Sequence, residues 1–244
     1  MTKQKNANYG IDGLIAILIF ILSGFAGFVL APIFLVFPII ETPVINIIVI
    51  NYFLWGGLTS DIIGFHFLYS TKIGKKKNCE RLINLIPWRG DERVLDVGCG
   101  RGILLISAAK MIKSGKAVGV DIWRQIDQHG NRMENTIENA KAEGVSDKIE
   151  VKDGDARDLP FEDEIFDVVV SSLVIHNIHD KKERERALNE IARVLKPGGY
   201  LAILDIVRID EYAPILRSIG ISEMKKIKAS FLFLHRVNVL FGKK

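Results

Sequence analysis

A short glycine-rich stretch carries the residues whose types and spacing indicate ligand chemistry. Asp96 lies near the end of an apolar run, and glycines follow it at every second position, namely Gly98, Gly100 and Gly102. Glycine has no Cβ, so such a turn lets a ligand approach the backbone closely. The apolar helix expected after the turn presents unpaired N–H groups and the positive end of its dipole. The stretch therefore predicts a cradle for a small molecule.

The spacing of these residues distinguishes between two kinds of nucleotide ligand. The dinucleotide fingerprint G-x-G-x-x-G would need its third glycine at Ile103, and it has no acid before its first glycine. Asp121 ends the next expected strand, where a carboxylate accepts hydrogen bonds from ribose hydroxyls. The two acids and the glycine spacing indicate an adenosine-type ligand with no pyrophosphate, and they argue against a nicotinamide-dependent oxidoreductase.

From Asn78 onward, short strands alternate with helices, and these elements must position the turn. The alternation predicts an open, mostly parallel α/β sheet whose ligands bind beyond the carboxyl ends of its strands. We expect Asn131 to cap the third helix and residues 197–199 to end the fourth. The expected strands are 93–97, 116–121, 149–152, 166–171 and 200–206, with two closing strands from residue 224. The expected helices are 79–85, 102–113, 132–143, 181–195 and 212–219.

Five motifs follow one another in this part of the chain: LDVGCGRG, GVDIW, GDARDLPF, FDVVVSS and RVLKPGGYL. Together they resemble the class I S-adenosylmethionine-dependent methyltransferases over about residues 78–244. The resemblance is to the small-molecule type, which includes enzymes that methylate quinones and lipids. It implies a Rossmann-like fold with a seven-stranded, mostly parallel sheet, and S-adenosylmethionine as the cofactor.

The resemblance also implies a role for each residue of the cofactor site. Asp96 would favour the α-ammonium of the cofactor's methionine end, and Gly98 and Gly100 would allow its close approach. Asp121 would hold the ribose diol. The cofactor-binding residues implied in this way are Asp96, Gly98, Gly100, Gly102, Asp121, Ile122, Trp123, Asp155, Ala156 and Ser171.

The adenine and sulfonium ends of the cofactor are assigned in the same way. Ile122 or Trp123 would pack on the adenine, and Asp155, with the backbone of Ala156, would accept from its amino group. Ser171 would face the sulfonium region. Trp123 as an ordinary core side chain and Asp155 as a loop-capping aspartate are the alternatives.

His176 and His179 are the candidate catalytic residues, because they follow the fourth strand, where enzymes of this family face the methyl acceptor. In-line displacement at a sulfonium mainly demands positioning, and a base is needed only when the nucleophile begins protonated. His176 is the first candidate for that base, and a positional histidine is the alternative. Too few further ligands lie nearby for a metal site. Loop 123–131 is either a cover for the adenosine or acceptor pocket or a surface decoration.

The first 70 residues are expected to form a two-helix transmembrane hairpin, with spans at about 11–37 and 44–64. Each run provides the roughly 20 residues that cross a bilayer, and Pro38 and Pro43 bracket the turn between them. A cleaved signal peptide, for which the first run is too long, and a buried hairpin in a soluble oligomer are the alternatives. Lysines flank both spans and none lies in the turn, so both termini and the catalytic domain are expected in the cytoplasm.

Charge agrees with a division into this anchor, a basic juxtamembrane segment at 71–90 and a methyltransferase domain at 91–244. Residues 1–78 hold six lysines and three acids, against a net charge of +4 for the chain. The basic excess beside the apolar region favours membrane lipid over nucleic acid as a partner. Cys79 and Cys99 belong to no metal-binding pattern.

These observations predict an S-adenosylmethionine-dependent methyltransferase, anchored in the cell membrane, that acts on a small apolar or lipid-like acceptor. A non-catalytic sensor that binds the same cofactor is the main alternative. A nucleic-acid methyltransferase is a further one, although the globular part shows no evident basic or aromatic face.

Overall fold

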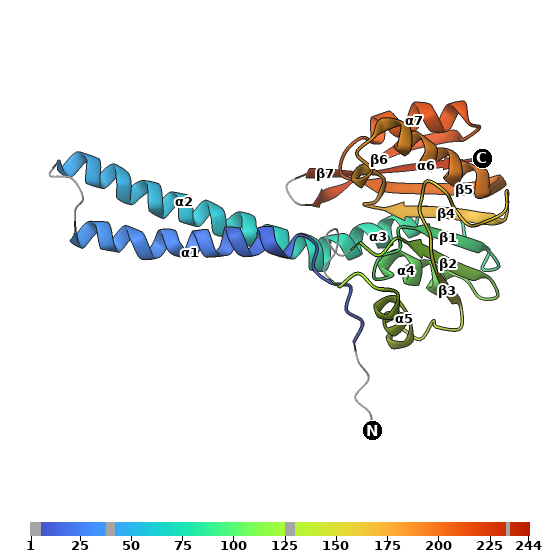
Figure 1. The fold of residues 1–244 in the computed structure, drawn as a ribbon, viewed down its shortest axis with the longest axis horizontal. Coiled ribbons are helices and arrows are strands. Elements are labelled where there is room, and N and C mark those ends of the chain that lie inside the picture. Colours follow the sequence, from blue (N-terminus) through green and yellow to red (C-terminus); the bar gives the residue numbers. More distant parts are fainter. Residues whose placement is uncertain (1–5, 38–41, 125–129, 233–234) are drawn as a thin grey trace, which may run out of the picture.

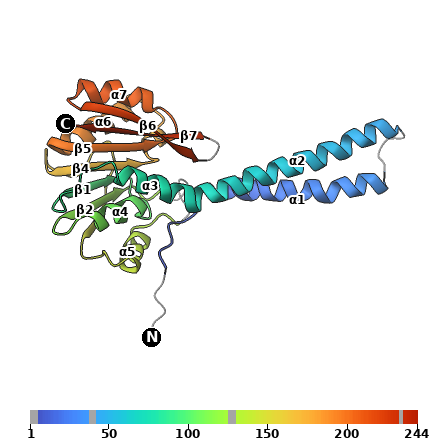
Figure 2. The same cartoon turned by 180° about the vertical axis from the view of Figure 1, so that it is seen from behind.

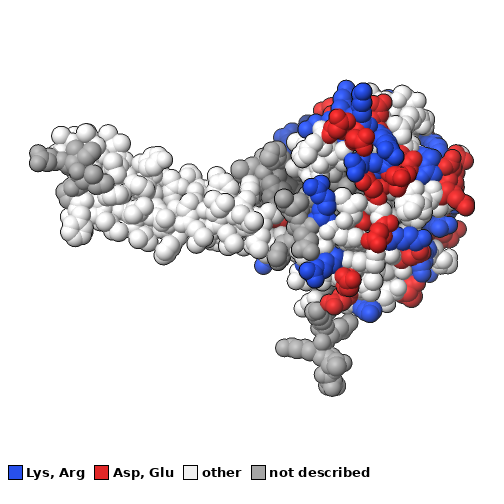
Figure 3. Space-filling view, viewed as in Figure 1, with Lys and Arg blue, Asp and Glu red and all other residues white. Residues whose placement is uncertain are grey.

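The computed structural model describes residues 6–37, 42–124, 130–232 and 235–244. A long helical hairpin projects from one side of a globular α/β part (Figure 1). On the face shown in Figure 3, the described hairpin surface carries neither acidic nor basic side chains, whereas both signs are interspersed over the globular part.

The hairpin consists of α1 (Leu14–Val36) and α2 (Pro43–Tyr69), which lie side by side in both views (Figures 1 and 2). Glycines bring the two backbones together. A Cβ added at Gly27 would lie 2.6 Å from the carbonyl oxygen of Phe53, and one at Gly57 would lie 2.9 Å from that of Gly24. Small residues of this kind let apolar helices approach closely. By length and composition alone, the two helices are able to cross a membrane.

The helix that contains the second expected span (44–64) continues beyond that span. It runs to Tyr69 and passes through a π-helical turn (Ser70–Gly74) directly into α3 (Lys75–Ile83). A Cβ at Gly64 would lie 2.8 Å from Cγ1 of Ile21, so this glycine permits packing against α1 and does not end the helix. One helical path therefore joins the hairpin to the globular part.

Seven strands form a single sheet, as expected. They are β1 (Arg93–Val97), β2 (Lys116–Asp121), β3 (Ile149–Asp153), β4 (Phe166–Ser172), β5 (Leu195–Asp205), β6 (Ser222–Leu232) and β7 (His235–Lys243). Their order is β3-β2-β1-β4-β5-β7-β6. The first five pair in parallel, and β7 is antiparallel to both β5 and β6. The sheet is thus mixed and mostly parallel, and its order changes direction beside β1.

Helices cover both faces of this sheet and enclose two hydrophobic cores. One face packs against α3, α4 (Ile103–Met111) and α5 (Met133–Ala142), and the other packs against α6 (Lys181–Val194) and α7 (Ile209–Ser218). A short 3₁₀ turn, η2 (Ile175–Asn177), follows β4. Asp180 caps α6, because its carboxylate accepts from the backbone N–H of Glu183 at 3.0 Å.

Two expected helix boundaries differ from the structure. Residues 197–199 do not end α6, which stops at Val194; they lie within β5, where the pairing with β4 shifts register. There the N–H of Gly198 donates to the carbonyl of Lys244 at 2.7 Å, so this part of β5 holds the backbone of Lys244. Asn131 does not cap α5, whose N-cap position is Arg132. Its amide instead donates to Asp121 at 3.1 Å.

The segment before α1 lies against the globular part. The backbone N–H of Asn8 donates to Oδ1 of Asn139 at 2.8 Å, and Nδ2 of Asn139 donates back to the carbonyl of Asn8 at 3.0 Å. Asp12 precedes α1 and pairs with Lys75 at the start of α3 at 2.9 Å. Residues 8–12 therefore connect α5 to the base of the hairpin.

Candidate functional site

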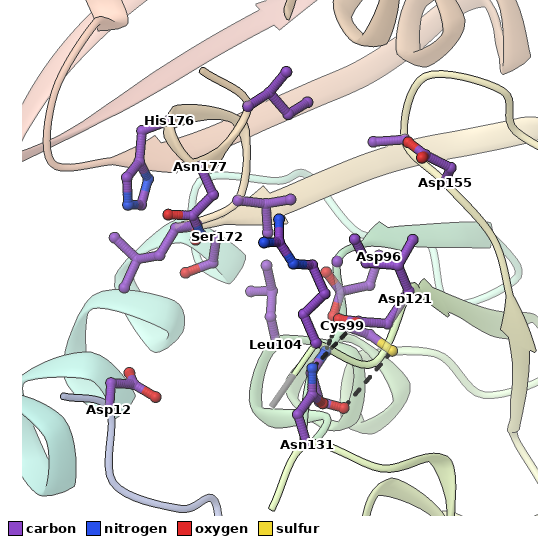
Figure 4. A pocket seen from close by; sticks show the side chains of 18 of the residues that line it. Asp12, Asp96, Cys99, Leu104, Asp121, Asn131, Asp155, Ser172, His176 and Asn177 are labelled. Atoms are coloured by element: carbon purple, nitrogen blue, oxygen red, sulfur yellow. Dashed lines mark hydrogen bonds between the residues drawn. The ribbon is translucent and has the colours of Figure 1, made fainter. Parts of the chain in front are cut away.

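A cavity of about 410 Å³ opens at the carboxyl ends of β1, β2 and β4, where parallel α/β sheets bind their ligands. Figure 4 shows Asp96, Asp121 and Asp155 toward one side of it, and Asp12 and His176 toward the other. Residues far apart in the sequence thus meet in one cavity with two chemically different ends.

Asp96 is the buried acid of this cavity. Its side chain is almost inaccessible to solvent, and Oδ2 has no hydrogen-bond partner among the described residues. Burial raises the pKa of Asp96 to about 8; a backbone hydrogen bond from Leu105 opposes this, the negative charge of Asp121 adds to it, and Lys75 weakly opposes it. A buried carboxylate in this state gains from a cationic partner. An ammonium group of a ligand would provide one.

The glycine turn next to Asp96 has the backbone that its sequence predicts. Gly98, Gly100 and Gly102 all have positive φ, which favours glycine. A Cβ at Gly98 would lie 2.3 Å from Cγ2 of Val174, so no larger residue fits. Gly98 and Gly100 line the cavity, whereas Gly102 begins α4 and faces Thr136 instead.

Asp121 joins the turn to the end of β2. Its Oδ2 accepts from the N–H of Gly100 at 2.8 Å, and its Oδ1 accepts from the N–H of Trp123 at 2.6 Å. The carboxylate lines the cavity and is fixed by these donors, and it has lone pairs left for further donors such as a ribose diol.

The expected adenine residues divide into two groups. Ile122, Asp155 and Ala156 line the cavity. Trp123 does not, because its indole N–H donates to Asp153 at 2.5 Å and its ring packs against the core. Ile122, which is half exposed, is therefore the apolar surface available to an adenine.

Asp155 lines the cavity and forms an ion pair with Arg157. Nη2 of Arg157 lies 2.5 Å from its Oδ2, and hydrogen bonding to Arg157 lowers the pKa of Asp155. The carboxylate is thus held ionised and oriented, as an acceptor for an exocyclic amine requires.

At the end of β4, the serine that reaches the cavity differs from the one expected. Ser171 is fully buried and donates to the carbonyl of Val97 at 2.9 Å. Ser172 lines the cavity instead. Successive side chains of a strand point to opposite faces of the sheet. A prediction that is wrong by one residue therefore selects Ser171 in place of Ser172.

His176 lies at the other end of the cavity with a buried carboxylate behind it. Its Nδ1 is 2.6 Å from Oδ1 of Asp205, which is fully buried, but the ring does not have the orientation of a hydrogen bond to it. The backbone N–H of His176 donates to Oδ2 of Asp205 at 3.2 Å. The hydroxyl of Tyr212 donates to Oδ2 of Asp205 at 3.1 Å. Asp205 therefore fixes the backbone at His176 and places a carboxylate beside its imidazole.

His179 also lines the cavity. Its backbone carbonyl accepts from Arg184 at 2.7 Å, which fixes the loop that carries both histidines. Among the described residues, no group of three His, Cys, Asp or Glu side chains is placed to hold a metal. Residues 125–129 of the expected covering loop lie outside the described part, although Arg124 and Asn131 at its ends line the cavity.

Several residues in or beside the cavity were not foreseen from the sequence. Asp205 lies in an apolar strand with no motif around it. Tyr9, Asp12 and Lys75 come from the segments that flank the hairpin, and only their place in the fold brings them here. The whole lysine run was interpreted as a lipid contact, so the position of Lys75 in the cavity, unlike that of its exposed neighbours, was not predicted.

Comparisons with known proteins agree with this geometry. A family model described as a methyltransferase domain matches residues 95–203. A demethylmenaquinone methyltransferase of Symbiobacterium thermophilum is 38% identical over 119 residues, which cover 48% of this chain and 44% of that protein. A chloroplastic 2-phytyl-1,4-beta-naphthoquinone methyltransferase of Arabidopsis thaliana is 36% identical over 124 residues, which cover 49% and 45%. The chain thus spans about half the length of these curated relatives.

Solved structures share the fold. An S-adenosylmethionine-dependent methyltransferase from Aquifex aeolicus has a TM-score of 0.55 at 21% identity, over 68% of this chain and 89% of that one. The [4+2]-cyclase SpnF has a TM-score of 0.58 at 18% identity, over 69% and 80%. A cyclase among the neighbours shows that this fold alone does not fix the reaction.

The cofactor's groups find matching partners in this cavity. The unpartnered Oδ2 of Asp96 suits an ammonium, the turn at Gly98 leaves room where a Cβ would not fit, and Asp121 offers a fixed acceptor. Residues 95–203 therefore match a methyltransferase domain, their fold is that of S-adenosylmethionine-dependent methyltransferases, and the cofactor is S-adenosylmethionine.

Proposed function

We propose that this chain is a membrane-anchored methyltransferase that transfers the methyl group of S-adenosylmethionine to a small apolar or lipid-like acceptor of quinone type. The observation that carries the proposal is the single cavity, which joins the cofactor residues Asp96 and Asp121 to the His176–Asp205 pair. The quinone methyltransferases among its relatives support the acceptor class.

The acceptor end of the cavity offers a base and a surface for positioning. When bound, S-adenosylmethionine supplies an electrophilic methyl group on a sulfonium. His176 accepts the proton of a hydroxyl acceptor at Nε2, while Asp205 stabilises the charged imidazole. Val174, Ile178 and Ile206 give this end apolar walls, which exclude water from the reacting groups and suit an apolar ring.

The hairpin supports a membrane location for this chemistry. Its apolar side chains are not covered by the described part of the chain: Ile15 is 76% exposed, Tyr52 74% and Phe25 66%. Core helices of a globular protein bury such side chains, whereas a bilayer solvates them. By the positive-inside rule, the lysines at the hairpin's base favour a cytoplasmic location of the methyltransferase domain and both termini.

The test uses the full chain in lipid vesicles with methyl-labelled S-adenosylmethionine. A naphthoquinol with an isoprenoid tail but no ring methyl group should become labelled, and S-adenosylhomocysteine should form in equal amount. Asp121→Ala should lose both products, because the cofactor's ribose loses its acceptor.

A tailless naphthoquinol in the same vesicles separates anchoring from chemistry. We expect it to react more slowly, since only the tailed acceptor is concentrated in the bilayer. Cofactor binding without any S-adenosylhomocysteine, for every acceptor tried, would contradict the proposal and would favour a sensor that only binds the cofactor.

A further inference from the structure

Lys75 differs from the other lysines at the base of the hairpin. Lys72, Lys76 and Lys77 are exposed to solvent. The side chain of Lys75 is only 13% exposed and lines the cavity, where its Nζ lies 2.9 Å from Oδ2 of Asp12. Three of the four lysines are therefore placed to contact lipid or solvent, and the fourth belongs to the site.

Asp96 faces the same cavity as Lys75. Its Oδ2 is buried and has no hydrogen-bond partner among the described residues. The positive charge of Lys75 is one of the influences on the pKa of Asp96, so the two groups are within electrostatic reach of each other. The ammonium of Lys75 pairs with Asp12.

The three charges are complementary to an α-amino acid. A zwitterion that places its ammonium at Asp96 is able to turn its carboxylate toward Lys75, the cation whose charge influences Asp96, although Arg101 and Arg124 also line the cavity. Asp12 fixes the position of the Lys75 ammonium through their ion pair. An apolar acceptor has no charged groups to pair with Asp96 and Lys75. The methionine end of the cofactor carries an ammonium and a carboxylate on one carbon.

We propose that Lys75, oriented by Asp12, binds the α-carboxylate of S-adenosylmethionine, so that the base of the hairpin forms part of the cofactor site. The proposal rests on the proposed function for the identity of the ligand. It also gives the hairpin a second task besides anchoring. Since α2 continues through Ser70–Gly74 into α3, the position of Lys75 depends on that of the membrane segment.

The test compares ligands that differ in the carboxylate alone. Calorimetry with the full chain in detergent gives the affinities for S-adenosylmethionine and for its decarboxylated form. Lys75→Met should weaken binding of S-adenosylmethionine by roughly ten- to hundredfold, the usual worth of a charge-assisted hydrogen bond. Its affinity for the decarboxylated cofactor should stay within about twofold of that of the unmodified protein, because that ligand has no group for Lys75 to bind.

Lys77→Met is the matched control, since it removes an equal charge from the exposed face of the same helix. It should bind both ligands as the unmodified protein does. Asp12→Asn should weaken binding of S-adenosylmethionine in the same sense as Lys75→Met. Equal thermal melting temperatures of the variants without ligand would show that the fold is retained.

Three results would overturn the inference. They are an unchanged affinity of Lys75→Met for S-adenosylmethionine, an equal loss of affinity for both ligands, and an increase in the KM of the acceptor alone. Failure of the proposed function gives a different pattern, in which binding depends on Lys75 as described but no methyl group is transferred.

Discussion

At the residue scale, the pair of His176 and Asp205 decides whether a base takes part. Asp205→Asn keeps a side chain of the same size but loses the charge that stabilises a protonated imidazole. We expect kcat to fall by roughly a hundredfold, the lower end of the contribution of a general base, with an unchanged cofactor affinity. His176→Gln should lower kcat by at least as much, because it removes the base itself.

Tyr212→Phe is the control for this pair. It removes only the hydroxyl that donates to Oδ2 of Asp205 at 3.1 Å, so kcat should change little. If Asp205→Asn alters only the KM of the acceptor, His176 serves to position the acceptor and does not take its proton.

Asp96 makes cofactor binding depend on pH. Its pKa is raised to about 8, chiefly by burial, so at pH 7 the folded protein without ligand holds this carboxyl mostly protonated. The cofactor's ammonium favours the ionised form and expels the proton. We therefore expect release of about one proton per cofactor at pH 7, and an affinity that rises as the pH rises toward 8.

Calorimetry in buffers of different ionisation enthalpy measures this proton release. The cofactor's own amino group titrates near ~8, so Asp96→Asn serves as the reference that retains this contribution. Equal proton release in the variant and the unmodified protein would show that Asp96 is already ionised before the cofactor binds.

The sequence predicts the role of a residue best where the pattern that indicates this role lies within a few neighbouring residues. The glycine turn and Asp121 were identified because a turn and the end of a strand are each indicated by the residue types within a few positions. Ser171 was confused with Ser172 because a strand reverses its faces at each residue. Trp123 was one of two candidates for the adenine; its indole N–H donates to Asp153, whereas Ile122 lines the cavity.

At the element scale, apolar runs predicted most strands to within a residue or two, since buried parallel strands are continuous and rich in branched residues. The start of β5 was missed because residues 197–199 contain Pro and two Gly, which ordinarily end helices. In the structure they lie where the pairing of β4 and β5 shifts register, and the N–H of Gly198 donates to the carbonyl of Lys244. The continuity of α2 and α3 was not predicted, because the apolar pattern that indicates a span at 44–64 does not show how far the helix continues into the basic segment that follows.

The packing of α1 against α2 can be tested through their glycines. Gly27→Leu places a side chain where a Cβ alone would lie 2.6 Å from the carbonyl of Phe53. We expect the helices to separate. The hydroxyls of Ser23 and Ser60 lie 3.0 Å apart, so the double variant Ser23→Cys and Ser60→Cys should form a disulfide readily, and the addition of Gly27→Leu should sharply reduce its yield.

Gly56→Leu is the matched control, because a Cβ at Gly56 meets no atom within 4 Å. It should leave the yield of the cross-link unchanged. An equal yield in the Gly27→Leu protein would mean that the helices are held together by something other than close glycine contact.

At the scale of the whole molecule, the hairpin and the site are not independent parts. The segment before α1 is tied to α5 through Asn8 and Asn139, and to α3 through Asp12 and Lys75. These contacts join residues more than sixty positions apart, so no local pattern in the sequence reveals them. The segments that flank the hairpin thus also line the cavity.

The orientation of the whole molecule gives its own prediction. If both termini are cytoplasmic, a thiol at the turn of the hairpin faces the outside of the cell, and a thiol on the globular part does not. Thr42→Cys should react with a membrane-impermeant maleimide on intact cells, whereas Lys182→Cys should react only after the cells are opened. Cys79 and Cys99 are buried, so the unmodified protein gives a low background. Labelling of Lys182→Cys on intact cells would place the methyltransferase domain outside, and labelling of neither variant until the cells are opened would show that the hairpin does not cross the membrane.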